Sequence, residues 1–157
     1  MPARSALSAA DIGLRVEGEP PDLDQAAHAA LGLALREAVT NIIRHSGAEA
    51  ALIRFAPEGV LVIEDDGKGM SEAELALCIE RHATSKLPVG EDGRDDLLNI
   101  GTMGFRGEAL PSIGSIARLS ITSQAKGEGD AFTIGVEGGQ THGTAPAAPL
   151  GRGGTRI

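Results

Sequence analysis

Residues 64 to 70 read EDDGKGM, in which three acidic side chains stand directly before a Gly-x-Gly. The apolar run 60 to 63 precedes them, so the carboxylates lie where a strand is expected to end and a loop to begin. Glycine lets the backbone approach neighbouring groups where a Cβ atom would obstruct it. By itself, a turn rich in Asp and Gly is most often only the end of a strand. A ligand site here therefore needs support from other motifs.

The composition predicts one domain without disulfide bonds. The chain has 157 residues, of which 41% are hydrophobic, and a domain of this size buries roughly two-thirds of its unfolded surface. The single cysteine, Cys78, fits a reducing cytoplasm. The first residues are too poor in apolar side chains for a signal peptide, and no apolar run approaches the ~18 residues of a membrane span. With a formal net charge of -8, DNA binding is not evident, and we expect a cytoplasmic domain with no membrane contact.

Apolar periodicity predicts alternating strands and helices in the first half of the chain. Residues 12 to 19 alternate like a half-buried strand, and a helix is expected from about Gln25 to His45. Residues 50 to 56 and 59 to 65 read as a hairpin. Ser71 with Glu74 forms a capping-box pattern for a helix that continues to about Arg81. One stripe of the long helix is apolar at Leu31, Leu35, Ala38 and Ile42.

The second half of the chain completes the predicted architecture. Residues 84 to 106 look like a long functional loop, and a short helix is expected to begin near Gly107. Strands are expected at 117 to 124, 130 to 138 and 154 to 157, and residues 138 to 154 read as turn-rich. We therefore predict a single α+β domain over 1 to 157 after a flexible N-terminus, residues 1 to 10. Its helices should lie on one face of a mostly antiparallel sheet.

Glu37 and Asn41 provide the first candidate chemistry. They lie four residues apart on the long helix, about a quarter turn from its apolar stripe, so they share one flank. An Asn oxygen suits Mg²⁺ coordination, and a carboxylate next to it suits water activation. A solvated helix face explains most Glu and Asn pairs at this spacing equally well, so the spacing alone decides little.

The segment LREAVTNIIRHSGA, residues 35 to 48, together with EDDGKGM resembles the ATP-binding domains of the Bergerat-fold, or GHKL, superfamily. That superfamily includes gyrase, the ninety-kilodalton heat-shock chaperones, histidine kinases and MutL. Glu37 and Asn41 match its N box, and Asp65, Gly67 and Gly69 match its Asp-x-Gly-x-Gly box. The resemblance implies a two-layer α/β sandwich that binds ATP or ADP with Mg²⁺.

Two branches of the superfamily are represented. Residues 11 to 70 look most like the catalytic domain of a sensor histidine kinase. The segments RHATSK, 81 to 86, and GFRGEALPSIGSIARL, 104 to 119, resemble the MutL-type DNA mismatch-repair ATPases. An engineered or recombined chimera remains an open interpretation. Both branches imply the same nucleotide pocket.

The resemblance also implies roles for individual residues. Asp65 would accept a hydrogen bond from the adenine amine, Glu37 would be the catalytic base, and Asn41 would hold Mg²⁺. Residues 84 to 106 would form an ATP lid, with Lys86 and Arg106 facing the phosphates. The nucleotide-binding residues implied in this way are Asp65, Gly67, Gly69, Thr84, Ser85, Lys86, Gly104, Phe105, Arg106, Gly107, Glu108, Ala109, Leu110 and Thr155.

Three functions stay open at this stage. The first is slow, Mg²⁺-dependent ATP hydrolysis of MutL type, with a nucleotide-dependent homodimer as the expected partner state. The second is the ATP-binding domain of a histidine kinase, whose phosphoacceptor helices are not recognised in residues 1 to 157. The third is a nucleotide-binding module without turnover, since the transducer lysine of the MutL relatives has no counterpart recognised in these residues.

Overall fold

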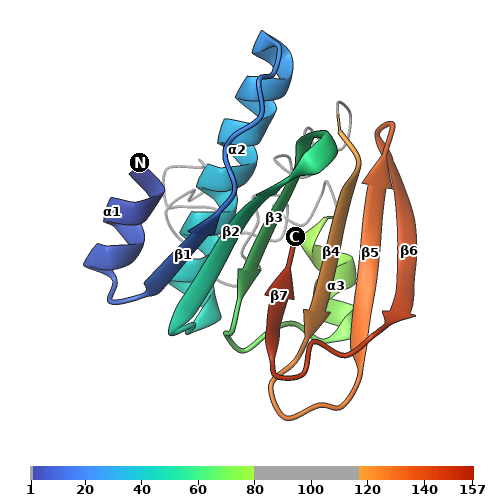
Figure 1. The fold of residues 1–157 in the computed structure, drawn as a ribbon. Helices are drawn as coiled ribbons and strands as arrows, with labels where there is room; N and C mark the ends of the chain where they lie inside the picture. Colours follow the sequence, from blue (N-terminus) through green and yellow to red (C-terminus); the bar gives the residue numbers. More distant parts are fainter. Residues whose placement is uncertain (1, 80–116) are drawn as a thin grey trace, which may run out of the picture.

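A single seven-stranded sheet organises the chain (Figure 1), whose computed structural model describes residues 2–79 and 117–157. The strand order is β1-β2-β3-β7-β4-β5-β6. The strands are β1 (Gly13–Glu17), β2 (Ala50–Ala56), β3 (Val60–Asp65), β4 (Leu119–Gln124), β5 (Ala131–Glu137), β6 (Gln140–Ala147) and β7 (Gly154–Arg156). The helices are α1 (Pro2–Ala9), α2 (Gln25–Asn41), which continues as a π-helical turn (Ile42–Ser46), and α3 (Glu72–Cys78).

The predicted α+β class is confirmed. β1 pairs with β2 in parallel, and the other pairs of neighbouring strands described here are antiparallel. α2 and α3 lie behind the sheet on the same side in Figure 1. In the described parts of the chain, no helix is both long and apolar enough to cross a membrane.

The core is divided between two clusters on the helix side of the sheet. One cluster packs α1 and the apolar stripe of α2 against β2 and β3, with Ala38, Ile53 and Ile63 among its buried residues. The other packs α3 against β4 and β5. Ile157 contacts both clusters, so the residue after β7 joins the two halves of the core.

The short strand β7 occupies the centre of the sheet. Asp65 of β3 and Ser123 of β4 both have Thr155 as their register partner. Reciprocal backbone hydrogen bonds of 2.8 and 2.9 Å between Ile157 and Ile63 extend the pairing with β3. The halves β1-β2-β3 and β4-β5-β6 are therefore joined within the sheet through three residues near the C-terminal end of the chain.

Local sequence signals account for the ends of the helices. The Asp24 carboxylate caps α2 by accepting a hydrogen bond from the Ala27 N–H at 2.8 Å. At α3 the predicted capping box is confirmed, because Ser71 and Glu74 exchange hydrogen bonds in both directions. α3 ends at Cys78 with Ile79 as its C-cap, so it is shorter than the predicted helix to about Arg81. The predicted loop 84 to 106 and the helix near Gly107 lie outside the described residues.

The N-terminal prediction is corrected by the structure. Residues 1 to 10 were expected to be flexible, but Pro2–Ala9 form α1. Leu7 is fully buried in the cluster beneath α2. The helix holds its place because one large apolar side chain in an otherwise mostly exposed segment is enough to attach it to the core.

The prediction for residues 138 to 154 was incomplete. The segment was expected to be turn-rich, yet residues 140–147 form the edge strand β6. Gly138 and Gly139 both have positive φ, 59° and 76°, which suits the two-residue turn joining β5 to β6. Most side chains of β6 are exposed, so the strand shows little apolar alternation and depends on pairing with β5.

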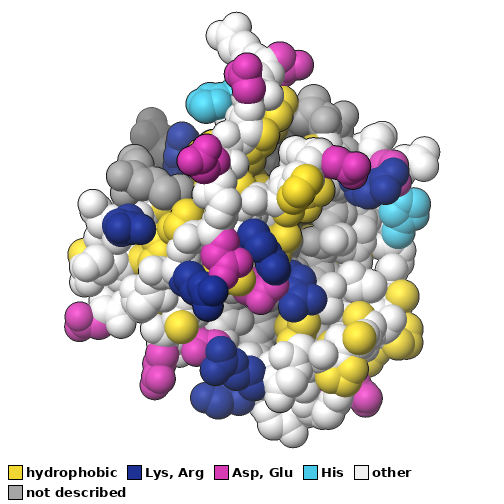
Figure 2. All heavy atoms as spheres, viewed as in Figure 1, with side chains coloured by type: hydrophobic (Ala, Val, Ile, Leu, Met, Phe, Trp, Pro, Cys, Tyr) yellow, Lys and Arg dark blue, Asp and Glu magenta, His cyan; other side chains and the backbone are white. Residues whose placement is uncertain are grey.

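The face of the sheet opposite the helices carries mixed charge (Figure 2), with Lys and Arg side chains among Asp and Glu. Glu64 accepts from Arg156 at 2.7 Å and lies 3.5 Å from Arg54, and Arg15 pairs with Glu17. Exposed ion pairs of this kind contribute little stability. The two clusters of buried apolar residues lie on the helix side.

Replacement of Leu7 by Ala should lower the free energy of unfolding by about 2 to 4 kcal/mol, because it leaves a cavity beneath α2. Ser8→Ala, on the exposed side of α1, is the matched control and should change stability by less than about 0.5 kcal/mol. Urea unfolding followed by circular dichroism measures both. Equal stability of the two variants would show that α1 does not contribute to the folded core.

Candidate functional site

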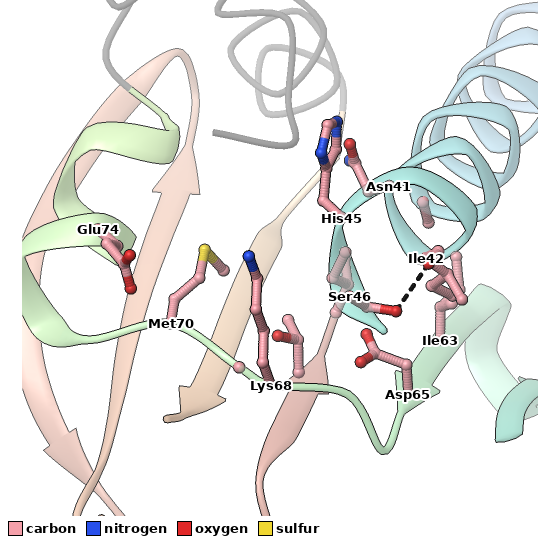
Figure 3. A pocket seen from close by; sticks show the side chains of 13 residues that line it. Asn41, Ile42, His45, Ser46, Ile63, Asp65, Lys68, Met70 and Glu74 are labelled. Carbon is pink, nitrogen blue, oxygen red and sulfur yellow. Dashed lines mark hydrogen bonds between the residues drawn. The ribbon is translucent and has the colours of Figure 1, made fainter. Parts of the chain in front are cut away.

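A cavity opens between α2, α3 and the turn that follows β3 (Figure 3). Asn41, His45 and Ser46 approach it from the end of the long helix, and Glu74 and Met70 from the α3 side. The complete lining is Ala38, Asn41, Ile42, His45, Ser46, Ile63, Asp65, Lys68, Gly69, Met70, Glu74, Thr155 and Ile157. Apolar walls with a few convergent polar groups are typical of small-molecule sites.

Asp65 is the buried carboxylate of this cavity. Burial raises the pKa of Asp65 to about 6, an effect partly opposed by the Gly67 N–H and increased by neighbouring Asp66. The Gly67 N–H donates to Asp65 Oδ1 at 2.9 Å, which fixes the carboxylate in place. Near neutral pH the carboxylate is therefore an ionised hydrogen-bond acceptor. Its loss of hydration on burial destabilises the folded state.

Asp66 has a structural role. Its Oδ1 accepts hydrogen bonds from the Glu49 and Ala50 N–H groups, both at 2.9 Å. Successive side chains at the end of a strand point to opposite faces of the sheet, so the two adjacent carboxylates have different roles. Asp65 lines the cavity, and Asp66 ties the turn to the start of β2.

The two glycines of the turn are required for packing within the protein. A Cβ at Gly67 would collide with the Ser46 backbone and side chain, and a Cβ at Gly69 would collide with the Gln124 carbonyl. Gly69 also has a positive φ of 65°. The neighbouring groups that these glycines approach most closely in the structure belong to two other segments of the chain, at Ser46 and Gln124.

The π-helical turn after α2 anchors this loop. The Ser46 hydroxyl donates to the Ile42 carbonyl at 2.7 Å (dashed in Figure 3) and accepts from the Ala48 N–H at 3.0 Å. The Ser46 carbonyl then accepts from the Lys68 N–H at 2.8 Å. The π-helical turn therefore directs the Ser46 carbonyl toward the loop at residue 68. Single π-helical turns are frequent at functional sites.

The two N-box residues are placed differently. Asn41 lines the cavity, and its side-chain Oδ1 and Nδ2 are buried without a hydrogen-bond partner among the described residues. A buried amide in that state is costly unless a ligand, ion or water completes it. Glu37 lies one turn earlier on α2 and does not line the cavity formed by the described residues.

Two basic side chains lie at the cavity. The pKa of His45 is lowered, first by burial and then by the neighbouring charges of Lys68 and Arg44. The imidazole is therefore neutral at neutral pH and Lys68 carries the positive charge that lines the cavity.

The structure brings some of the predicted nucleotide-binding residues together. Thr155, Asp65 and Gly69 line the cavity, and Gly67 belongs to the same turn. The remaining predicted nucleotide residues, Thr84, Ser85, Lys86, Gly104, Phe105, Arg106, Gly107, Glu108, Ala109 and Leu110, lie outside the described residues.

Other lining residues were missed in the sequence. Ile63 precedes Asp65 by two positions, so strand alternation places both on one face, and this signal was available. Lys68 stands between the two glycines of the motif. Ile157 and Met70 offered no distinctive signal, because their place depends on the pairing of β7 and the path of the turn.

Comparison with known families identifies a match to most of the chain. Residues 26–137 match the family described as "Histidine kinase-, DNA gyrase B-, and HSP90-like ATPase". The match begins in α2 and ends with β5, so it includes the turn and Asn41 but not Thr155 and Ile157, the two cavity-lining residues at the end of the chain.

Curated relatives are MutL proteins. The chain is 55% identical over 126 residues to DNA mismatch repair protein MutL of Caulobacter vibrioides, covering 79% of this chain and 20% of that protein. It is 48% identical over 130 residues to MutL of Phenylobacterium zucineum, covering 79% of this chain and 21% of that protein. The chain thus spans about a fifth of the length of these relatives. The match to MutL of Caulobacter vibrioides covers 79% of the chain, whereas residues 71 to 157 are only just over half of it. The likeness to MutL therefore extends into the first half of the chain.

A solved structure is also similar. The crystal structure of the 43K ATPase domain of Thermus thermophilus gyrase B in complex with an aminocoumarin has a TM-score of 0.49 and 21% sequence identity, over 82% of this chain and 32% of that chain.

Replacement of Asp65 by Asn should stabilise the ligand-free chain at pH 7. An acid whose pKa is raised on folding destabilises the folded state as the pH rises from about 4 to about 6, so removing it should add up to about 3 kcal/mol above pH 6. Asn keeps an oxygen for the Gly67 N–H. Urea unfolding without nucleotide should show this gain shrinking as the pH falls toward 4. A gain that does not depend on pH would contradict a buried, ionised Asp65.

Proposed function

Because the chain belongs to the histidine kinase-, DNA gyrase B- and HSP90-like ATPase family, we propose that its cavity binds ATP or ADP with Mg²⁺ and hydrolyses ATP slowly, in the manner of a MutL mismatch-repair ATPase. The observation that carries the proposal is the buried, fixed carboxylate of Asp65 in the lining of the cavity. A MutL assignment agrees with the identity of 48 to 55% to two MutL proteins.

The apolar residues of the lining suit a purine base. Ile63, Met70 and Ile157 provide walls for the ring, and Asp65 provides an acceptor for an amino group. Guanine presents a carbonyl oxygen where adenine carries that amino group. A buried acceptor opposite a carbonyl would leave two unmet acceptors, so adenine should be preferred.

Two polar residues of the lining suit Mg²⁺ and phosphate. Asn41 has an unsatisfied amide oxygen of the type that Mg²⁺ accepts, and Lys68 lies in the same lining. Asn41 would therefore hold the ion, which when bound neutralises charge on the phosphates. Lys68 adds a positive charge for the same anionic groups.

Glu37 is the proposed general base. In this role its carboxylate accepts a proton from water as the water oxygen bonds to the γ-phosphorus and the bond to the ADP oxygen breaks. Its place one turn before Asn41 on α2 supports the assignment. The proposed turnover is slow, well below ~1 s⁻¹.

The role of a longer protein is also proposed from the relatives. Likeness to MutL supports a function in DNA mismatch repair in the cytoplasm and a homodimer that forms when nucleotide binds. The histidine kinase alternative is supported by the sequence resemblance of residues 11 to 70 and by the family description. Incubation with labelled ATP, with separate measurement of free phosphate and of phosphoprotein, distinguishes hydrolysis from phosphoryl transfer to the protein.

Asp65→Asn should weaken Mg-ATP binding by about thirtyfold, about 2 kcal/mol, because the amide can present a donor to the amino group. Asp66→Asn is the matched control, since its oxygen can still accept from residues 49 and 50 and its side chain does not line this cavity. Titration calorimetry with ATP and GTP measures both variants. Equal affinity of the unmodified chain for ATP and GTP, or unchanged ATP binding by Asp65→Asn, would reject the adenine assignment.

Glu37→Ala should retain Mg-ATP binding and lose most hydrolysis, about 10² to 10⁴-fold, as expected for loss of a general base. Asn41→Ala should instead weaken binding when Mg²⁺ is present and change it little in EDTA. A phosphate-release assay and calorimetry separate the two effects. Hydrolysis by Glu37→Ala at the unmodified rate would exclude its role as base.

A further inference from the structure

Three neighbouring strands place polar side chains in one row on the helix side of the sheet. Asp65 of β3 and Ser123 of β4 are the register partners of Thr155 on either side of β7. Asp65 and Thr155 line the cavity, whereas Ser123 is 0% exposed. Directly opposed residues in an antiparallel pair have Cβ atoms about 5 Å apart, so each can influence the next.

Ser123 binds three groups through one hydroxyl oxygen. The Met70 N–H donates to Ser123 Oγ at 2.8 Å, and Ser123 Oγ lies 3.0 Å from the Gly154 carbonyl oxygen and 2.8 Å from Thr155 Oγ1. A hydroxyl has one proton and two lone pairs. Because a carbonyl only accepts, the Ser123 proton goes to Gly154, and because an N–H only donates, Met70 uses one lone pair.

The second lone pair of Ser123 must then receive the proton of Thr155. The Thr155 hydroxyl has no other proton, so what remains for the cavity is its lone pairs. Its neighbour Asp65 is also an acceptor, since one of its oxygens already takes the Gly67 N–H. Asp65 and Thr155 therefore both offer acceptors to the cavity. An exocyclic amino group, with two N–H donors, is the ligand group that matches them.

We propose that Ser123 is a positioning residue that holds the Thr155 hydroxyl as an acceptor toward the cavity and thereby selects bases with an exocyclic amino group. The inference rests on the proposed nucleotide binding and adds a second acceptor to the one supplied by Asp65. Ser123 also fixes Met70, the residue after Gly69, so the same hydroxyl connects β4, β7 and the end of the turn.

The test compares ATP with purine riboside triphosphate, which differs from ATP only by lacking the 6-amino group. The ratio of the two dissociation constants, measured by titration calorimetry with the full chain, reports the contribution of the amino group. Ser123→Ala frees Thr155 to turn its proton toward the ligand, so the preference for ATP should fall about three- to tenfold. Thr155→Val, which removes the acceptor, should lower the preference for ATP by a similar factor. The double variant should lower that preference little further than either single variant does.

Thr122→Ala is the matched control. Thr122 is the preceding residue of β4, its hydroxyl bonds Thr133 at 3.1 Å, and it does not line the cavity, so the ratio should stay unchanged. If Ser123→Ala or Thr155→Val weakens both nucleotides equally, Ser123 only supports the fold and the inference fails while nucleotide binding stands. If Ser123→Ala does not fold, an unchanged ratio in Thr155→Val overturns the inference. Failure of the unmodified chain to bind either nucleotide would overturn the proposed function itself.

Discussion

The pairing of β7 between β3 and β4 is the constraint on which the rest of the described structure depends. Two sheet halves, each with its own helix and core cluster, are connected in the sheet through Gly154–Arg156. Gly154 makes this possible because a Cβ there would collide with the Asp65 carbonyl, and its φ of 144° is one that other residues rarely adopt. The insertion brings Thr155 next to Asp65 and Ile157 into both clusters, so closing the sheet also forms one wall of the cavity.

The cavity is a place where stability and ligand binding oppose each other. Asp65 loses hydration on folding, and Asn41 leaves both polar atoms of its amide unpaired among the described residues. Each feature destabilises the empty protein. Under the proposed function, a ligand would offset both costs by supplying an amino group to the carboxylate and a cation to the amide oxygen. Each of the two side chains would then contribute to binding.

The turn after Asp65, residues 66 to 69, is held mainly by backbone contacts. The Lys68 N–H donates to the Ser46 carbonyl, and the Lys68 carbonyl accepts from the Lys126 N–H at 2.7 Å. Gly67 and Gly69 permit this packing against the π-turn and β4. A ligand then meets a preformed acceptor, which reduces the ordering that binding must impose.

The sequence by itself determined the fold class, the long helix with its apolar stripe, the hairpin, the capping box and the Asp-x-Gly-x-Gly turn, because each depends on residues close together in the chain. It missed α1 and β6, where a single buried Leu7 and pairing with β5 decide the structure. Only the tertiary structure decided that β7 is central, that Gly67 and Gly69 pack against the protein itself, and that Ser123 reaches Thr155 and Met70. The physical reason is that these contacts join residues far apart in the chain, and no local pattern records them. Ser123 and Gly154 are 31 positions apart, for example, and Glu64 and Arg156 are 92 positions apart.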